Sequence, residues 1–243
     1  MTFISILLAT IALAFALRNP LRACPWAFYG LAILLNVGYI AGIEGFLPRD
    51  VYLLFVALMG KCMLALALFV VVMFIGVFSL DSRIGRWLRP VRAELSIVAW
   101  ICSLGHMAVY LASYAPRLVG GGAFAGNILF SFAVAVALLV LLLILGVTSF
   151  QIVKRAMPSP SWKRVQRLAY PFFGLVYVHL MLMLAPAAIR GGAQAQLSIA
   201  IYTLIFGSYA VLRIARALRD RRAKDADPDT QAQAAEFEIL ATH

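Results

Sequence analysis

The sequence predicts an all-α integral membrane protein, a bundle of about seven transmembrane helices with its N-terminus outside and its C-terminus in the cytoplasm. Hydrophobic residues make up 64% of the 243 residues and charged residues only 13%. A soluble domain carries about 45–50% apolar residues, and a disordered chain carries fewer still. The apolar residues gather in long runs, and the basic residues gather in the connections between them. This composition excludes a water-soluble globular protein and a disordered chain.

We expect seven apolar runs to form the spans, at 2–17, 25–43, 51–78, 93–115, 127–150, 168–188 and 195–217. The first run is short, but Arg18 and Arg22 follow it and no basic residue precedes it. A cleaved signal peptide has the reverse order of charges, so we expect the first run to be retained as a span. Residues 1–217 are therefore expected to form one transmembrane domain. Residues 218–243 are expected to form a short flexible cytoplasmic tail.

The distribution of Lys and Arg predicts the orientation. Seventeen of the 21 basic residues lie in one set of alternate connections and in the stretch from Arg213 to Lys224. The opposite connections hold only Arg49, Arg117 and Arg190, and Lys61 lies inside a span. By the positive-inside rule, this asymmetry predicts a multi-pass protein of a prokaryotic plasma membrane. The net charge of +11 is thus explained by orientation and is no argument for nucleic-acid binding. The basic cluster after the last span either stops translocation or contacts anionic membrane lipids.

Two histidines lie inside the predicted spans, where an ionisable residue is costly unless it is paired or functional. His106 lies about 21 Å and His179 about 16 Å from the inner ends of their spans, at 1.5 Å per residue. Both fall in the outer half of the bilayer at a similar depth. Two neutral imidazoles in this arrangement can ligate a haem iron from both sides. The alternative is a pair of core histidines satisfied by Ser, Tyr or backbone oxygens.

Lys61 lies in the third predicted span at nearly the same level, roughly 15 Å from the outer face. An ammonium group there needs an anion, and no span contains Asp or Glu at a comparable depth. A haem propionate is one candidate partner. The alternative is a lysine that snorkels to the outer headgroups. Arg117 and Arg190 follow the two spans that carry the histidines, and they are either further propionate ligands or interface anchors.

Two segments resemble a known family. Arg92 precedes His106 by fourteen residues, and Thr148–Ser149 are followed by a basic linker and by the segment from Trp162 to His179. Together they resemble the ferric-reductase-like transmembrane domain over residues 83–184. The likeness is greatest to the haem-binding membrane subunits that serve periplasmic methionine sulfoxide reductases. The resemblance implies a b-type haem held by His106 and His179, and the absence of C-x-x-C-H agrees with non-covalent binding.

The sequence departs from the family at the inner side of the membrane. Gln166 stands where the family has a histidine, and Ala93 and Ser96 replace the second Arg and the Gly of R-R-x-L-G. Since glutamine is a poor iron ligand, an inner haem is expected to be lost or to be held through a residue such as Arg92. The candidate metal ligands are therefore His106 and His179. The candidate cofactor-binding residues are Lys61, Arg92, Arg117, Gln166 and Arg190.

The resemblance implies one-electron transfer through the haem. Neither a dinucleotide-binding motif nor a P-loop is present, so we expect an electron-transfer subunit of an oxidoreductase complex and not a stand-alone enzyme. Its expected donor is a quinol such as menaquinol, and its expected acceptor is an extracytoplasmic flavoprotein or haem protein. One alternative is a two-haem conduit across the bilayer with an atypically ligated inner haem. Another is a haem-free transporter or scaffold.

Overall fold

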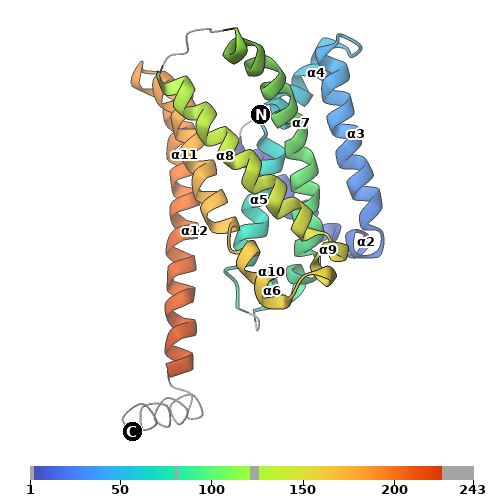
Figure 1. The fold of residues 1–243 in the computed structure, drawn as a ribbon, viewed down its shortest axis with the longest axis vertical. Helices are drawn as coiled ribbons and strands as arrows, with labels where there is room; N and C mark the ends of the chain where they lie inside the picture. The colour runs from blue at the N-terminus through green and yellow to red at the C-terminus, as the bar shows by residue number, and fades with distance from the viewer. Residues whose placement is uncertain (1–2, 80–81, 121–125, 226–243) are drawn as a thin grey trace.

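The computed structural model describes residues 3–79, 82–120 and 126–225, and within these ranges the chain is helical and contains no β-strand (Figure 1). The elements are α1 (Phe3–Ala16), α2 (Arg18–Ala23), α3 (Pro25–Ile43), α4 (Arg49–Phe55), η1 (Val56–Gly60), α5 (Met63–Ile75), α6 (Arg83–Leu88), η2 (Arg89–Val91), α7 (Arg92–Val119), α8 (Gly126–Ser149), α9 (Gln151–Ala156), α10 (Ser159–Gln166), α11 (Ala169–Ile189) and α12 (Ala193–Asp225).

Six helical segments are long and apolar enough to cross a membrane: Pro25–Ile43, Arg49–Ile75, Arg83–Pro116, Ile128–Ser149, Ser159–Ile189 and Ala193–Arg222. They coincide with six of the seven expected runs. The remaining run forms α1, which has only 14 residues. At 1.5 Å per residue α1 is about 21 Å long, shorter than a hydrocarbon core of about 30 Å. Its buried residues Phe3 and Ile6 pack with residues of α5 and α12.

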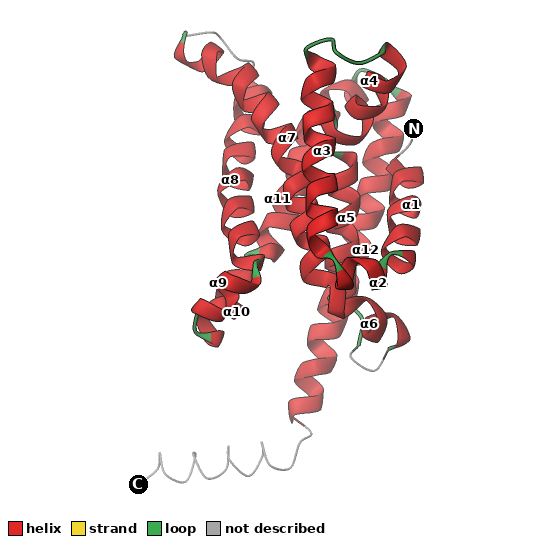
Figure 2. Ribbon diagram, turned by 90° about the vertical axis from the view of Figure 1, so that its right-hand side faces the viewer, coloured by secondary structure: helices red, strands yellow, loops and turns green. Residues whose placement is uncertain are grey.

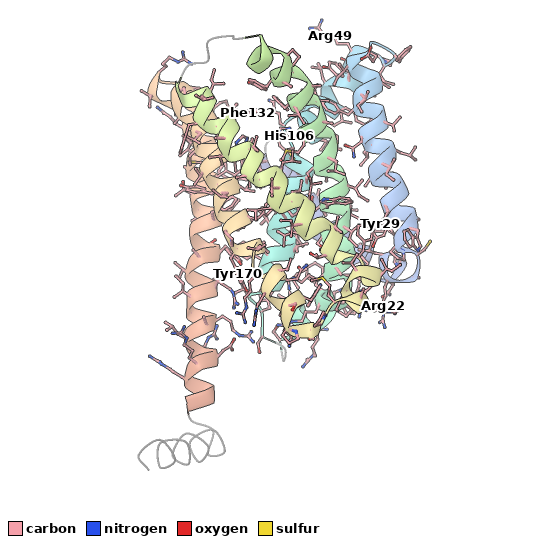
Figure 3. The ribbon with its side chains drawn as sticks, viewed as in Figure 1. Arg22, Tyr29, Arg49, His106, Phe132 and Tyr170 are labelled. Carbon is pink, nitrogen blue, oxygen red and sulfur yellow. The ribbon has the colours of Figure 1, made fainter. Side chains whose placement is uncertain are left out.

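The connections that carry most of the basic residues share one end of the bundle. Figure 1 shows α2, α6, α9 and α10 at the end from which the C-terminal part of α12 projects. In Figure 3, Arg22 and Tyr170 lie toward this end, and Arg49 lies at the opposite end. We call the first the basic end. The grouping of charges expected from the sequence is therefore present in the fold.

The last helix is longer than expected. The sequence placed the end of the span at residue 217 and a flexible tail after it, but α12 continues to Asp225. One turn of this extension carries an ion pair between Arg216 Nε and Asp220 Oδ1 at 2.8 Å, with the i,i+4 spacing that supports an isolated helix. The rest of the expected tail, 226–243, lies outside the described residues.

The second long span is interrupted, where the sequence predicted a continuous helix over 51–78. Helix α4 passes into the π-helical turn η1, in which the amide of Lys61 donates to the carbonyl of Val56 at 2.9 Å. Cys62 then adopts the left-handed conformation with φ of 55°, and α5 starts at Met63. Pi-helical turns in membrane helices leave backbone groups that need partners from neighbouring helices. The interruption therefore creates a polar backbone position inside the bundle.

Helix α5 is the central helix of the bundle. It packs against α1 and α7, and its residues contribute to both larger apolar clusters. Ala65 and Ala67 are almost completely buried, so small side chains let the neighbouring helices approach closely. A third cluster joins α7, α8 and α11 around Leu138 and Phe172. Figure 2 shows α8, with α9 and α10 beneath it, on the side of the bundle away from α1.

Candidate functional site

His106 lies on α7, and its ring is oriented by a backbone group of a different helix. Nδ1 of His106 lies 2.7 Å from the carbonyl oxygen of Gly60, the last residue of η1. A carbonyl oxygen can only accept a hydrogen bond, so Nδ1 is the nitrogen that carries the proton. Nε2 of the neutral ring then keeps its lone pair.

The interruption after Gly60 explains why its carbonyl is available. In a continuous helix this oxygen would accept from the amide four residues later. Here the amides of Lys61 and Cys62 bond to Val56 and Met59, and α5 starts afresh at Met63. The Gly60 carbonyl therefore turns to α7.

His179 on α11 is oriented in a corresponding way by α8. Its Nδ1 lies 3.3 Å from Oγ of Ser131, and this hydroxyl donates to Sδ of Met183 at 3.2 Å. With the proton on Nδ1, His179 donates to Oγ and keeps the lone pair of Nε2; in the other tautomer the hydroxyl donates to Nδ1. Ser131 is 4% exposed, so the bond is shielded from competing water. The first tautomer corresponds to that of His106.

The two imidazoles lie on different helices, and each is hydrogen-bonded to a further element, His106 to η1 and His179 to α8. Their helices α7 and α11 share no extended contact in the described part of the chain, and α8 packs against both. Among the described residues neither Nε2 takes part in a hydrogen bond. Hydrogen bonds at both Nδ1 atoms would also be expected if the two histidines had only a structural role in the core. If both rings carry their proton on Nδ1, their two Nε2 atoms are nitrogen donors of the kind that a bis-imidazole haem needs.

Aromatic rings surround the His106 side of the site. The ring centroid of Tyr110 lies 4.6 Å from that of His106. Tyr114 lies 6.3 Å beyond Tyr110, and Phe132 of α8 lies 6.1 Å from Tyr114. In Figure 3, His106 and Phe132 lie nearer to the end marked by Arg49 than to the basic end. Aromatic rings of this kind are suitable neighbours for the edge of a porphyrin.

Two of the other residues expected on this side, Lys61 and Arg190, have exposed side chains. Lys61 lies in the interruption directly after Gly60, and its side chain is exposed. Arg190 is exposed and donates from Nε to the carbonyl of Pro186 in its own helix at 3.1 Å. Arg117 is part of α7, but its side chain lies outside the described residues.

Arg92 and Gln166, the two residues expected at an inner haem, lie at the basic end. Both line a cavity of about 220 Å³. Nε2 of Gln166 donates to Oγ1 of Thr148 at 3.0 Å, and Nε of Arg92 donates to the carbonyl of Val72 at 3.1 Å. No histidine is among the residues that line the cavity in the described structure. A bis-imidazole inner haem therefore does not fit this position.

Sequence reasoning missed two residues of the site, Gly60 and Ser131. A serine in an apolar run is visible as a polar residue, but its partner lies 48 residues away. Nothing in the sequence marks the Gly60 carbonyl, since any residue carries one. Asn36 bridges α3 and α7, because its Nδ2 donates to the carbonyl of Ile101 at 2.7 Å.

Comparison with known proteins adds one relative. The chain is 47% identical over 132 residues to an uncharacterized protein of Treponema pallidum (strain Nichols). The shared region is 54% of this chain and 37% of the relative, so the chain spans little more than a third of the length of that protein. No family model and no solved structure matches the chain. The functional argument therefore depends on the geometry of the site.

Proposed function

We propose that this protein is a membrane cytochrome b subunit of the ferric-reductase-like family, with one haem held between Nε2 of His106 and Nε2 of His179. The observation that carries the proposal is the pair of Nδ1 hydrogen bonds, to the Gly60 carbonyl and to the Ser131 hydroxyl. Ligating histidines in proteins characteristically donate their second N–H in this way, which fixes the tautomer and the ring orientation.

The proposed topology has seven crossings, with α1 as the first. Helix α1 packs along α5 and leads into α2 at the basic end. The basic end faces the cytoplasm of a prokaryotic cell by the positive-inside rule. The histidine pair then lies in the half of the membrane that faces away from the cytoplasm.

The haem supplies one-electron chemistry, and the protein residues position it. Gly60 and Ser131 hold the two rings, and the flanking aromatic residues exclude water. The donor is a membrane quinol of the menaquinol type, which reaches the site from within the bilayer. Exposed Tyr110 beside His106 and exposed Lys61 beside Gly60 are the polar groups that a quinol or a propionate would meet. The acceptor is an extracytoplasmic flavoprotein or haem protein.

The first test is a visible spectrum of the detergent-purified protein, oxidised and dithionite-reduced, with a pyridine haemochrome assay. One b-type haem per chain is expected. His106→Ala and His179→Ala should each abolish the low-spin spectrum, and His243→Ala should leave it unchanged as a matched control. A normal spectrum in both variants would overturn the assignment. Two haems per chain would support the two-haem conduit, and no haem after reconstitution with hemin would support the transporter or scaffold.

The donor is tested on the same preparation. Menadiol should reduce the haem of the wild-type protein anaerobically, and NADH without an added reductase should not. If menadiol leaves the haem oxidised while dithionite reduces it, the quinol part of the proposal is wrong and the haem assignment stands.

A further inference from the structure

The cavity at the basic end is separate from the histidine pair and is strongly cationic. It lies among α5, α7, α8, α10 and α11, and Arg89, Arg92 and Lys154 line it. No carboxylate lines it in the described structure. The first turn of α7, whose helix dipole is positive at this end, also borders it. Cations placed at a helix N-terminus repel the dipole. Glu94 in the same turn offsets part of this repulsion, but it does not line the cavity.

Arg89 and Arg92 use only some of their N–H groups to bond to carbonyls near the C-terminal end of α5. Nη2 of Arg89 donates to the carbonyl of Phe78 at 2.8 Å, and Nε of Arg92 donates to that of Val72 at 3.1 Å. These bonds cover the C-terminal end of α5, as basic side chains often do. Each guanidinium has five N–H donors, so most of them are left over. Lys154 is exposed in the last turn of α9, and its ammonium lies 4.8 Å from the ring centroid of Trp162.

Two buried donors beside the cavity lack an acceptor among the described residues. They are Nε of Arg89 and Nε1 of Trp100, and both side chains line the cavity. Buried N–H groups are paired in the great majority of proteins, so unpaired ones call for a partner that the chain itself does not supply. An acceptor-rich group would satisfy them.

The interior of the cavity is apolar. Val72, Leu142 and Phe172 line it from α5, α8 and α11. The cavity thus joins a cationic rim to an apolar interior, which is the complement of an amphiphilic anion. Arginine pairs and helix N-termini favour phosphate, because its oxygens accept several N–H bonds at once.

We propose that this cavity binds a phosphate-bearing amphiphile, with the phosphate on Arg89, Arg92 and Lys154 and the apolar part against α5, α8 and α11. Two sources share this chemistry: the headgroup of an anionic phospholipid and a soluble phosphate ester. The site needs no haem, so it stands independently of the proposed electron transfer.

The test uses the full-length protein in a neutral detergent after removal of lipid. Native mass spectrometry would measure binding of dioleoyl phosphatidylglycerol against zwitterionic dioleoyl phosphatidylcholine, and calorimetry would measure binding of inorganic pyrophosphate. The variant is Lys154→Gln, because Lys154 holds no backbone group and its loss should not prevent folding. The matched control is Arg155→Gln, which removes the neighbouring charge of α9 that does not line the cavity.

We expect saturable binding at one site, about tenfold weaker in Lys154→Gln, since a charge-assisted hydrogen bond contributes roughly this much. Arg155→Gln should stay within about twofold of wild type. If phosphatidylglycerol binds and pyrophosphate does not, the natural ligand is a phospholipid headgroup. If pyrophosphate binds and phosphatidylglycerol does not, the natural ligand is a soluble phosphate ester. Absence of saturable binding for both probes, or equal weakening in the two variants, would overturn the proposal. So would a second haem per chain that Lys154→Gln removes.

Discussion

The carbonyl oxygen of Gly60 accepts a hydrogen bond of 2.7 Å from Nδ1 of His106, across 46 residues and between two membrane helices. Gly60 has no space for a side chain, because an added Cβ would lie 2.9 Å from the hydroxyl of Tyr39. The same residue thus ends the π-helical turn, packs against α3 and orients the candidate ligand.

Gly60→Ala should therefore weaken haem binding without removing a ligand. The new methyl group displaces either Tyr39 or the backbone that bonds to His106. Loss of an outer partner of a metal ligand typically costs 10–100-fold in affinity, so we expect about a tenfold weaker titration with hemin. Gly30→Ala is the control, since nothing lies within 4 Å of its added Cβ. Equal affinities in the two variants would contradict the role given to Gly60.

Ser131→Ala should affect the other ligand. It removes the acceptor of His179 Nδ1–H and leaves a cavity no larger than a hydroxyl group. We expect the low-spin spectrum to persist and the midpoint potential to shift, because the ring loses the partner that fixes its orientation and basicity. A redox titration measures this, with Ser198→Ala as control, since the Ser198 hydroxyl makes an exposed bond within its own helix, to the carbonyl of Gln194. An unchanged potential in Ser131→Ala would show that this bond does not act on a metal ligand.

Close packing beside His106 predicts a coupled pair of substitutions. An added Cβ at Gly105 would overlap Oδ1 of Asn36, which bridges α3 to α7. Gly105→Ala should destabilise the protein by about 1–3 kcal/mol, the usual cost of overpacking. Asn36→Ala relieves the overlap, so the double variant should be more stable than the sum of the two single effects predicts. Thermal unfolding in detergent measures all four proteins. If the two effects are strictly additive, the methyl group added at position 105 does not contact the Asn36 side chain.

The orientation can be measured by labelling single cysteines in intact cells with a membrane-impermeant maleimide. In a background with Cys24, Cys62 and Cys102 changed to Ala, Arg49→Cys should be labelled from outside. Arg86→Cys should be labelled only after permeabilisation. An epitope at the N-terminus tests α1: its accessibility in intact cells supports seven crossings. If the epitope is protected in intact cells, α1 does not cross the membrane and the protein has six crossings.

The sequence predicted the spans well where a uniform apolar run meets a clear boundary. The run 25–43 coincides with α3, whose Pro25 starts the helix at the position where a missing N–H costs least. It did not predict the interruption after Gly60. Apart from Lys61, the segment around Gly60 is as apolar as its neighbours. Hydrophobicity does not predict the backbone hydrogen-bond pattern, so it cannot distinguish a π-helical turn from a continuous α-helix. In the structure, Tyr39 lies beside Gly60 and His106 bonds to the Gly60 carbonyl at this interruption.

The candidate site was predictable in part. His106 and His179 stand out because imidazoles are rare in spans, and the structure gives Nδ1 of each ring a hydrogen-bond partner on another element. Lys61 was expected to face a haem propionate, a contact that stays a prediction, and its side chain is exposed. Gln166 was expected to mark a lost haem ligand, and the structure shows that it ties α10 to α8. A residue type states which bonds a side chain can make, but the bundle decides which partners come within reach.

Composition and charge order by themselves determined that the chain is a bundle of membrane-length helices with its basic connections at one end. Both properties follow from local preferences, the burial of apolar runs in lipid and the retention of cations on one side. Only the tertiary structure decided that Gly60 and Ser131 hold the two imidazoles and that Arg89, Arg92 and Lys154 share a cavity. These are contacts between segments distant in the sequence, and they depend on helix rotation and on one interrupted span, neither of which a hydrophobic pattern encodes.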